Sequence, residues 1–202
     1  MATKTLDQVL KGIEKDYGKG IAKIGADALE VEGVLSLGSP MVDYCLYGGL
    51  PEGRIIEYSG AEGSGKTSSS FLVAASYCKE ELKRHPVGEE WEFRGEVHVG
   101  PRKIIFLDNE GTLDPSWAKV FGYDLSEDAD VQTIVIRPEA QSAEEIFDMA
   151  LDLLKTGEVG LLIFDSIATL VPQQIAEASM EQQQMGGIAK SLTRFANTAI
   201  GV

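Results

Sequence analysis

The sequence has few cysteines, few histidines and no long apolar run, and each shortage excludes a class of protein. Its two cysteines, Cys45 and Cys78, and its two histidines show no spacing typical of a metal site or a disulfide framework. We therefore expect both cysteines to be buried, reduced thiols. No apolar stretch is long enough to span a membrane, and residues 1–20 are too charged for a signal peptide. We expect a cytoplasmic protein without a membrane partner.

Positive charge is scarce as well. The chain has 18 lysines and arginines against 32 aspartates and glutamates, which gives a net charge of -14. This balance argues against a protein that covers a duplex with a broad basic surface. It leaves open DNA binding in a local groove, because phosphate contacts depend on where the few cations lie.

The length of 202 residues suits one domain with a small appendage. We expect residues 1–32 to form a helix and linker, and residues 33–202 to form the main domain. Thr5 and Gln8 have the spacing of a capping box, which predicts a helix that ends near Gly18. The apolar stripe of this helix can pack on its own domain or on another subunit, and the pattern does not decide between the two.

Residues 85–102 interrupt the pattern and predict a surface hairpin, with its turn at Arg94-Gly95. An exposed insertion without activity is the favoured interpretation. The rest of the main domain alternates strands with helices, which predicts an α/β fold with a doubly wound, mainly parallel sheet. The expected strands are Arg54–Ser59, Lys103–Leu107, Val131–Ile136 and Gly160–Phe164. The expected helices follow the loop at residues 60–67, begin at Asp114-Pro115, begin at Ser142 and run from Gln183 to Ala199.

A glycine-rich loop precedes the first of these helices and matches the phosphate-loop pattern at every fixed position. It consists of Gly60, Ala61, Glu62, Gly63, Ser64, Gly65, Lys66 and Thr67, and Ser68 follows it. Glycines let backbone amides surround phosphate oxygens at a helix N-terminus. Lys66 is then expected to bridge the β- and γ-phosphates as a catalytic cation, and Thr67 to bind Mg²⁺. The alternative, a flexible turn that matches by chance, is disfavoured by the predicted strand and helix on either side.

Two acidic residues follow apolar strands. Asp165, followed by Ser166, ends the strand GLLIF and is expected to hold Mg²⁺ together with Thr67. Glu110 follows the strand KIIFL and can polarise a water in line with the γ-phosphate. A solvated loop acid is an equally good interpretation of Glu110 from spacing alone.

Three segments together resemble the bacterial RecA recombinases in the family's order. They are GLPEGRIIEYSGAEGSGKTS, FLDNEGTLDPSWAKVFG and LLIFDSIATLVP. The resemblance implies a P-loop NTPase core that binds ATP and Mg²⁺, with Glu110 as catalytic glutamate. It also implies that Asp114 and Trp117 contact adenine, where the family usually has Tyr in place of Trp117. A core aromatic remains the alternative for Trp117.

The resemblance also includes residues that contact DNA in the family. Met185 and Gly186 match the family's first DNA-binding loop, and Lys190 stands where an arginine contacts the DNA backbone. Without the family, Gln182–Gln184 is only a polar stretch before a helix. The family forms head-to-tail filaments on single-stranded DNA, through the N-terminal helix, and pairs them with double-stranded DNA.

The family's second DNA loop lies beyond Val202, so we expect a C-terminally incomplete core, with a second polypeptide as one source of the rest. The favoured function is an ATP-dependent DNA recombinase and repair protein with DNA-dependent ATPase activity. The alternatives are a helicase-type ATPase with a RecA core, and a truncated nucleotide-binding module without turnover.

Overall fold

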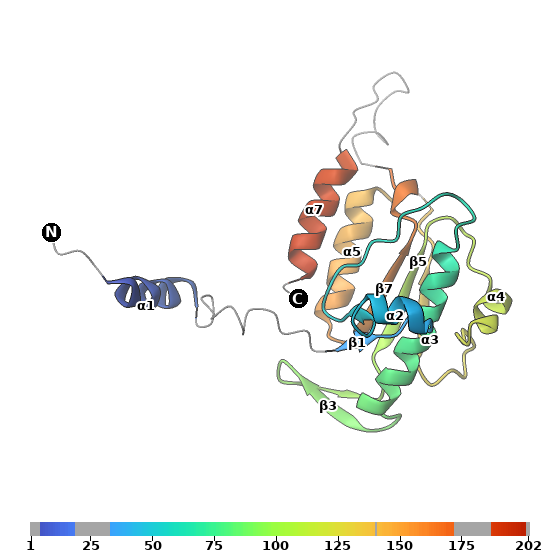
Figure 1. The fold of residues 1–202 in the computed structure, drawn as a ribbon, viewed down its shortest axis with the longest axis horizontal. Helices are drawn as coiled ribbons and strands as arrows, with labels where there is room; N and C mark the ends of the chain where they lie inside the picture. Colours follow the sequence, from blue (N-terminus) through green and yellow to red (C-terminus); the bar gives the residue numbers. More distant parts are fainter. Residues whose placement is uncertain (1–4, 19–32, 140, 172–186, 201–202) are drawn as a thin grey trace, which may run out of the picture. The chain divides into compact units, whose positions relative to one another are not determined.

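The computed structural model describes residues 5–18, 33–139, 141–171 and 187–200 (Figure 1). The chain divides into two compact units, Met1–Gly33 and Val34–Val202, and each is described by itself. Our division after residue 32, between a helix with its linker and the main domain, stays a prediction. In the described part of the chain, no helix is long and apolar enough to cross a membrane.

The first unit contains helix α1 (Leu6–Tyr17), which begins and ends as its sequence predicts. The amide of Gln8 donates to Thr5 Oγ1 at 3.4 Å, and the amide of Thr5 donates to Gln8 Oε1 at 3.1 Å. Gly18 ends the helix with a φ of 105°, a conformation that favours glycine. The apolar stripe is open to solvent, since Leu6 is 73% exposed and Val9 43%.

The second unit is built on a parallel sheet with the strand order β6-β5-β7. Its strands are β5 (Lys103–Asp108), β6 (Thr133–Ile136) and β7 (Val159–Asp165). Leu107 pairs with Ile136 on one side and with Phe164 on the other, so all three strands point the same way. The predicted parallel α/β sheet is confirmed, and its strands share one carboxyl end.

Helices cover both faces of this sheet (Figure 1). On one face, Ile104 and Phe106 of β5 pack with α3 (Lys66–Arg84). On the other, Ile105 and Leu107 pack with α5 (Ala143–Lys155). Helix α7 (Gly187–Ala199) lies beside α5, and the part of the expected helix before residue 187 lies outside the described residues. Alternate side chains of β5 therefore pack into two separate hydrophobic cores, one on each face of the sheet, as a doubly wound fold requires.

Three short elements precede the glycine-rich loop in the chain. The strands β1 (Val34–Leu35) and β2 (Leu50–Pro51) pair antiparallel, and α2 (Pro40–Cys45) lies between them in the chain. Helix α2 buries none of its residues, so Cys45 is exposed and our expectation of a buried thiol was wrong there. Cys78 on α3 is half-buried, and burial raises the pKa of its thiol to about 11.

The expected strand Arg54–Ser59 is not formed. These residues have no strand assignment, and Ile55 and Ile56 are 48% and 41% exposed. A strand exists only with a hydrogen-bonded neighbour, and among the described residues β7 pairs only with β5. The segment is rich in apolar residues, as a strand would be, but no described strand lies against it. The glycine-rich loop is therefore flanked by regular structure only on its helix side.

The predicted hairpin is confirmed as β3 (Glu90–Phe93) and β4 (Glu96–Val99). Trp91 anchors it: the ring lies 4.5 Å from that of His85 and 4.6 Å from that of His98. The indole N–H also donates to the carbonyl of Gly100 at 2.8 Å. A two-stranded ribbon alone is marginal in water, so these contacts account for its order.

Candidate functional site

The glycine-rich loop leads directly into the first turn of α3. Gly63 and Gly65 have φ values of 72° and 90°, which favour glycine, and Gly65 is the N-cap of the helix. Because α3 begins at Lys66, its first backbone amides point toward the loop, together with the positive end of the helix dipole. This is the local geometry of an anion site, and it agrees with the phosphate-loop prediction.

The side chains of Lys66 and Thr67 each form hydrogen bonds at the glycine-rich loop or next to it. The Lys66 ammonium donates to the carbonyls of Gly60 and Ala61, each at 3.0 Å, so it lies over the loop. The Thr67 hydroxyl donates to Asp165 Oδ2 at 2.7 Å, across 98 positions of sequence. The predicted phosphate loop and the predicted carboxylate at the end of β7 are thus brought together.

Asp165 is placed where a cation would stabilise it. Burial, together with the nearby carboxylates of Glu110 and Asp108, raises the pKa of Asp165, while the Thr67 hydroxyl and Lys66 lower it. Hard oxygen ligands of this kind suit Mg²⁺, which usually takes one or two carboxylates and completes its shell with water and phosphate. In the part of the chain that the structure describes, no three or more His, Cys, Asp or Glu side chains form a group that could hold a metal ion.

Glu110 lies in the loop that follows β5, next to the end of β7. The Ser166 hydroxyl donates to Glu110 Oε1 at 2.5 Å, and the amide of Asn109 donates to the Asp165 carbonyl at 2.9 Å. Asp108 and Asp165 are paired in the sheet register. The parallel arrangement therefore places the exposed Glu110 carboxylate near Asp165, as its predicted role requires.

Trp117 lies on α4 (Pro115–Val120), next to the start of α3. Its indole N–H donates to Ser68 Oγ at 3.4 Å, and the ring packs edge-on against Phe121 at 5.1 Å. The side chain is 50% exposed, which excludes the core alternative. Asp114 accepts from the amides of Ser116 and Trp117 as the N-cap of α4, as predicted. Adenine contact by Asp114 and Trp117 stays a prediction.

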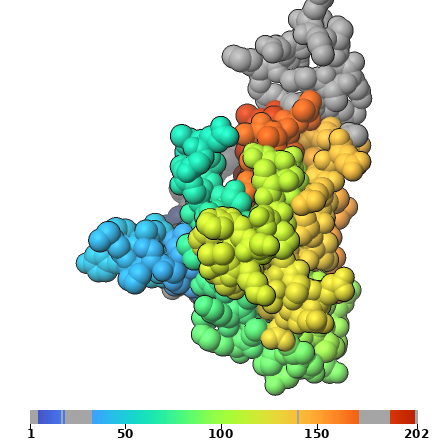
Figure 2. All heavy atoms as spheres, turned by 90° about the vertical axis from the view of Figure 1, so that its right-hand side faces the viewer, coloured from blue at the N-terminus to red at the C-terminus, as the bar shows by residue number. Residues whose placement is uncertain are grey.

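These groups gather at the carboxyl end of the sheet. Figure 2 shows the teal phosphate-loop segment and the yellow-green segment that follows β5 on one face, at the same end of the domain. Ligands of open α/β sheets bind at this end. The arrangement can therefore surround a polyphosphate with an ammonium, a hydroxyl and two carboxylates.

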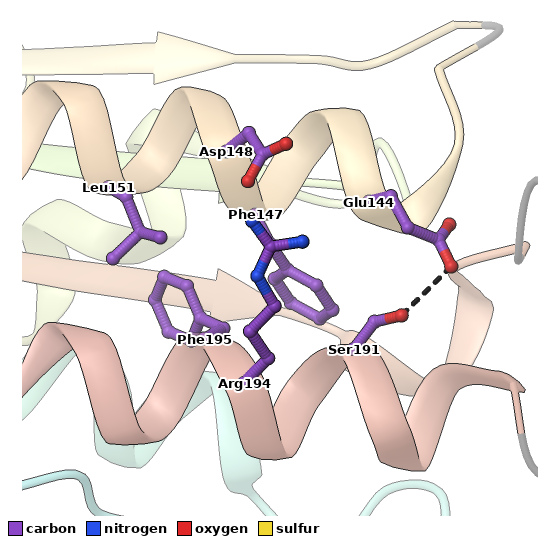
Figure 3. A pocket seen from close by; sticks show the side chains of 7 residues that line it. All are labelled: Glu144, Phe147, Asp148, Leu151, Ser191, Arg194 and Phe195. Carbon is purple, nitrogen blue, oxygen red and sulfur yellow. Dashed lines mark hydrogen bonds between the residues drawn. The ribbon is translucent and has the colours of Figure 1, made fainter.

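The predicted DNA-binding residues are only partly described. Met185 and Gly186 lie outside the described residues, and Lys190 is exposed on α7. Helix α7 packs on α5 through stacked Phe195 and Phe147, 5.1 Å apart, and leaves a cavity of about 30 Å³ between the helices (Figure 3). None of the predicted site residues lines this gap.

A larger cavity, of about 280 Å³, lies where the hairpin meets the start of β5. Its lining includes Trp91, His98, Lys103 and Glu158, and none of the predicted site residues. It lies at the amino end of the strands, away from the carboxylates of the candidate site. We therefore place no predicted role there.

Asp108 is a residue whose importance the sequence did not reveal. Only 2% exposed, it accepts from the amides of Thr112 and Leu113 and from the Arg137 guanidinium. A carboxylate at the end of an apolar strand was the only available signal, and it drew attention to Glu110 instead. Arg137 follows β6 and belongs to no motif, so its pairing with Asp108 could not be predicted.

Comparison with known proteins is consistent with this geometry. A family model described as the RecA N-terminal domain matches residues 4–85 and 95–198. The chain belongs to the RecA family. The residues between the matched segments include all of β3, so the hairpin contains a stretch that the RecA model does not cover.

Relatives named Protein RecA match over nearly the whole chain. That of Paracoccus denitrificans is 36% identical over 195 residues, covering 95% of this chain and 47% of that protein. That of Listeria monocytogenes serotype 4a is 32% identical over 199 residues, covering 98% and 49%. That of Phytoplasma mali is 30% identical over 201 residues, covering 98% and 51%. The chain thus spans about half the length of the curated relatives it matches.

Proposed function

We propose that this chain binds and hydrolyses ATP with Mg²⁺ and couples hydrolysis to single-stranded DNA, as a recombinase and repair protein of the RecA family. The observation that carries the proposal is the 2.7 Å hydrogen bond from Thr67 to Asp165. It joins the phosphate loop to the end of β7, and Glu110 lies in the loop that follows the adjoining strand β5. Family membership supports DNA as the partner.

Each residue has a defined part in this proposal. The amides of residues 60–68 and the Lys66 ammonium bind the phosphates of ATP, and Asp114 and Trp117 bind the adenine. Thr67 and Asp165 hold Mg²⁺, which when bound neutralises charge on the phosphate oxygens. Glu110 accepts a hydrogen bond from a water and orients this water toward the γ-phosphate. The water takes the place of the Ser166 hydroxyl, which donates to Glu110 in the structure.

The DNA part of the proposal rests on Met185, Gly186 and Lys190. Lys190 is exposed on α7, where its charge can reach a phosphate backbone. A lysine contributes a point charge where an arginine would contribute a planar fork, so we expect backbone contact without base recognition. Double-stranded DNA enters only during pairing.

Phosphate release measured with and without single-stranded DNA tests the function. We expect binding of a fluorescent ATP analogue, and hydrolysis that accelerates when the DNA is added. Nucleotide binding without any turnover would contradict the enzymatic part. Directional unwinding of a duplex would favour a helicase-type ATPase, and failure to bind the analogue would contradict the whole proposal.

Self-assembly is the second part that can be tested directly. The capped helix α1 leaves Leu6 and Val9 exposed, which suits docking on a neighbouring copy in a head-to-tail filament. Deletion of residues 1–18 is therefore expected to abolish concentration-dependent assembly in sedimentation velocity. Replacing Lys11 and Lys15 by alanine, which keeps the apolar stripe, is the control. Assembly that survives the deletion would disprove the role of α1.

A further inference from the structure

The loop that carries Glu110 is held at both ends. At its start, the amide of Asn109 donates to the Asp165 carbonyl at 2.9 Å, and the Asn109 side-chain amide donates to the Ser166 carbonyl at 3.0 Å. At its far end, the amides of Thr112 and Leu113 donate to the two carboxylate oxygens of Asp108, at 3.0 and 3.3 Å. Glu110 lies between these two attachments.

The second attachment depends on a buried charge. The Asp108 side chain has no exposed area, so its charge has lost its hydration. Such a group is stable only when it is paired and hydrogen-bonded. Arg137 supplies the pairing, since its Nε donates to Asp108 Oδ2 at 2.9 Å.

The pair links three parts of the domain. Arg137 follows β6, Asp108 ends β5, and Leu113 is itself buried in the core on the α3 face. One residue beyond Leu113, Asp114 begins α4, which carries Trp117. The carboxylate of Asp108 therefore sets the path of the chain between the predicted water-orienting residue and the predicted adenine contacts.

We propose that Arg137 is a positioning residue for ATP hydrolysis, which acts through Asp108 to fix the loop that carries Glu110. The inference rests on the proposed function, because positioning matters only if Glu110 orients the attacking water. Arg137 itself touches neither phosphate nor water in this proposal. Without it, Asp108 keeps its two amides but loses its counter-charge, and the loop gains freedom near Glu110.

The test compares Arg137→Gln and Arg137→Lys with a matched control, Arg84→Gln. Arg84 also pairs with a carboxylate, that of Glu52, at 2.8 Å for both contacts, and it takes no part in the site. We expect Arg137→Gln to lower kcat about tenfold, well within the ~100-fold that a misplacement of 1 Å can cause. The KM for ATP and the affinity for a fluorescent analogue should stay within about twofold of wild type, since no phosphate contact is lost.

Arg137→Lys separates charge from geometry. Lysine keeps the counter-charge but loses the planar N–H groups, so we expect it to restore only part of the lost kcat. The control Arg84→Gln should leave kcat unchanged. A kcat of Arg137→Gln equal to that of wild type would overturn the inference, and so would an equal fall in kcat and nucleotide affinity.

A structural readout makes the result independent of turnover. Amide hydrogen exchange of Thr112 and Leu113 should accelerate in Arg137→Gln, and not in Arg84→Gln, because their acceptor is no longer held. Unchanged exchange at these two amides would refute the positioning role even if the wild-type chain hydrolysed no ATP. A wild type without turnover but with accelerated exchange in the variant would contradict the proposed function, and with it the role in hydrolysis, and would leave only the coupling of Arg137 to the loop.

Discussion

Replacing Glu110 by glutamine is expected to lower the turnover of ATP by about 10²–10⁴-fold, the usual contribution of a positioned acid or base. The amide fills the same space but cannot accept a proton or polarise water as the carboxylate does. Binding of a fluorescent ATP analogue should be nearly unchanged, because Glu110 contacts the water and not the phosphates. Steady-state phosphate release, with saturating ATP and single-stranded DNA, is the measurement.

Two comparison variants make this result specific. Glu92→Gln removes an exposed carboxylate from the hairpin, outside the candidate site, and should leave turnover unchanged. Lys66→Ala should instead weaken binding of the analogue about tenfold or more, since a hydrogen bond to a charged group contributes ~1.5–3 kcal/mol. Turnover in Glu110→Gln equal to that of wild type would show that Glu110 is a solvated loop acid, which is the alternative that spacing alone could not exclude.

Replacing Glu81 by alanine is expected to lower the free energy of unfolding by about 3–5 kcal/mol, the cost of breaking a buried ion pair. The Glu81 side chain is fully buried on α3 and accepts from the amide, Nε and Nη2 of Arg102, at 2.8 to 2.9 Å. The Arg102 side chain, which is 27% exposed, would then lose its partner. Urea unfolding followed by circular dichroism measures the change.

The control lies one position earlier in the helix. Glu80→Ala breaks an exposed pair with Lys83, whose side chain is 69% exposed, and should change stability by at most about 1 kcal/mol. The double variant Glu81→Leu with Arg102→Leu should recover much of the loss, because an apolar pair of similar volume often replaces a buried ion pair without cost. Equal effects of Glu80→Ala and Glu81→Ala would contradict the buried-pair argument.

The same pair predicts a pH dependence. Burial alone would raise the pKa of Glu81, but the hydrogen bonds and charge of Arg102 outweigh it and hold the pKa below the ordinary 4.5. A carboxyl whose pKa is lower in the folded state stabilises the protein above its unfolded pKa, and the contribution disappears as pH falls through the folded value. The stability difference between wild type and Glu81→Ala should thus be full at neutral pH and shrink below about pH 4.

Local signals in the sequence were sufficient for the elements whose causes are local. The capping boxes at Thr5 and Ser142 join residues three apart, and both are formed as predicted. The hairpin turn at Arg94-Gly95 is equally local. The segment Arg54–Ser59 failed because a strand also needs a neighbour, and no pattern within six residues states which strand lies beside it.

The candidate site likewise contains some contacts that sequence signals predict and others that depend on distant parts of the chain. Because parallel strands share one carboxyl end, Asp165 was expected near the phosphate loop from the sequence, whereas the expectation for Glu110 depended on the family resemblance. Asp108 ends β5 and Arg137 follows β6, 29 positions apart, and the order of these strands in the sheet is not written in either segment. Their pairing follows from the order β6-β5-β7, which only the structure supplies.

The placement of the two tryptophans gives the protein two optical reporters of different kinds. Trp117 is half exposed beside Ser68, so a purine stacked on it would quench its emission or shift the emission wavelength. Trp91 lies between two imidazoles, 4.5 and 4.6 Å away, at the opposite end of β5. Its fluorescence would follow the protonation of His85, whose pKa burial lowers, and would not respond to nucleotide. With either indole replaced by phenylalanine, each signal could be recorded alone, without any attached dye.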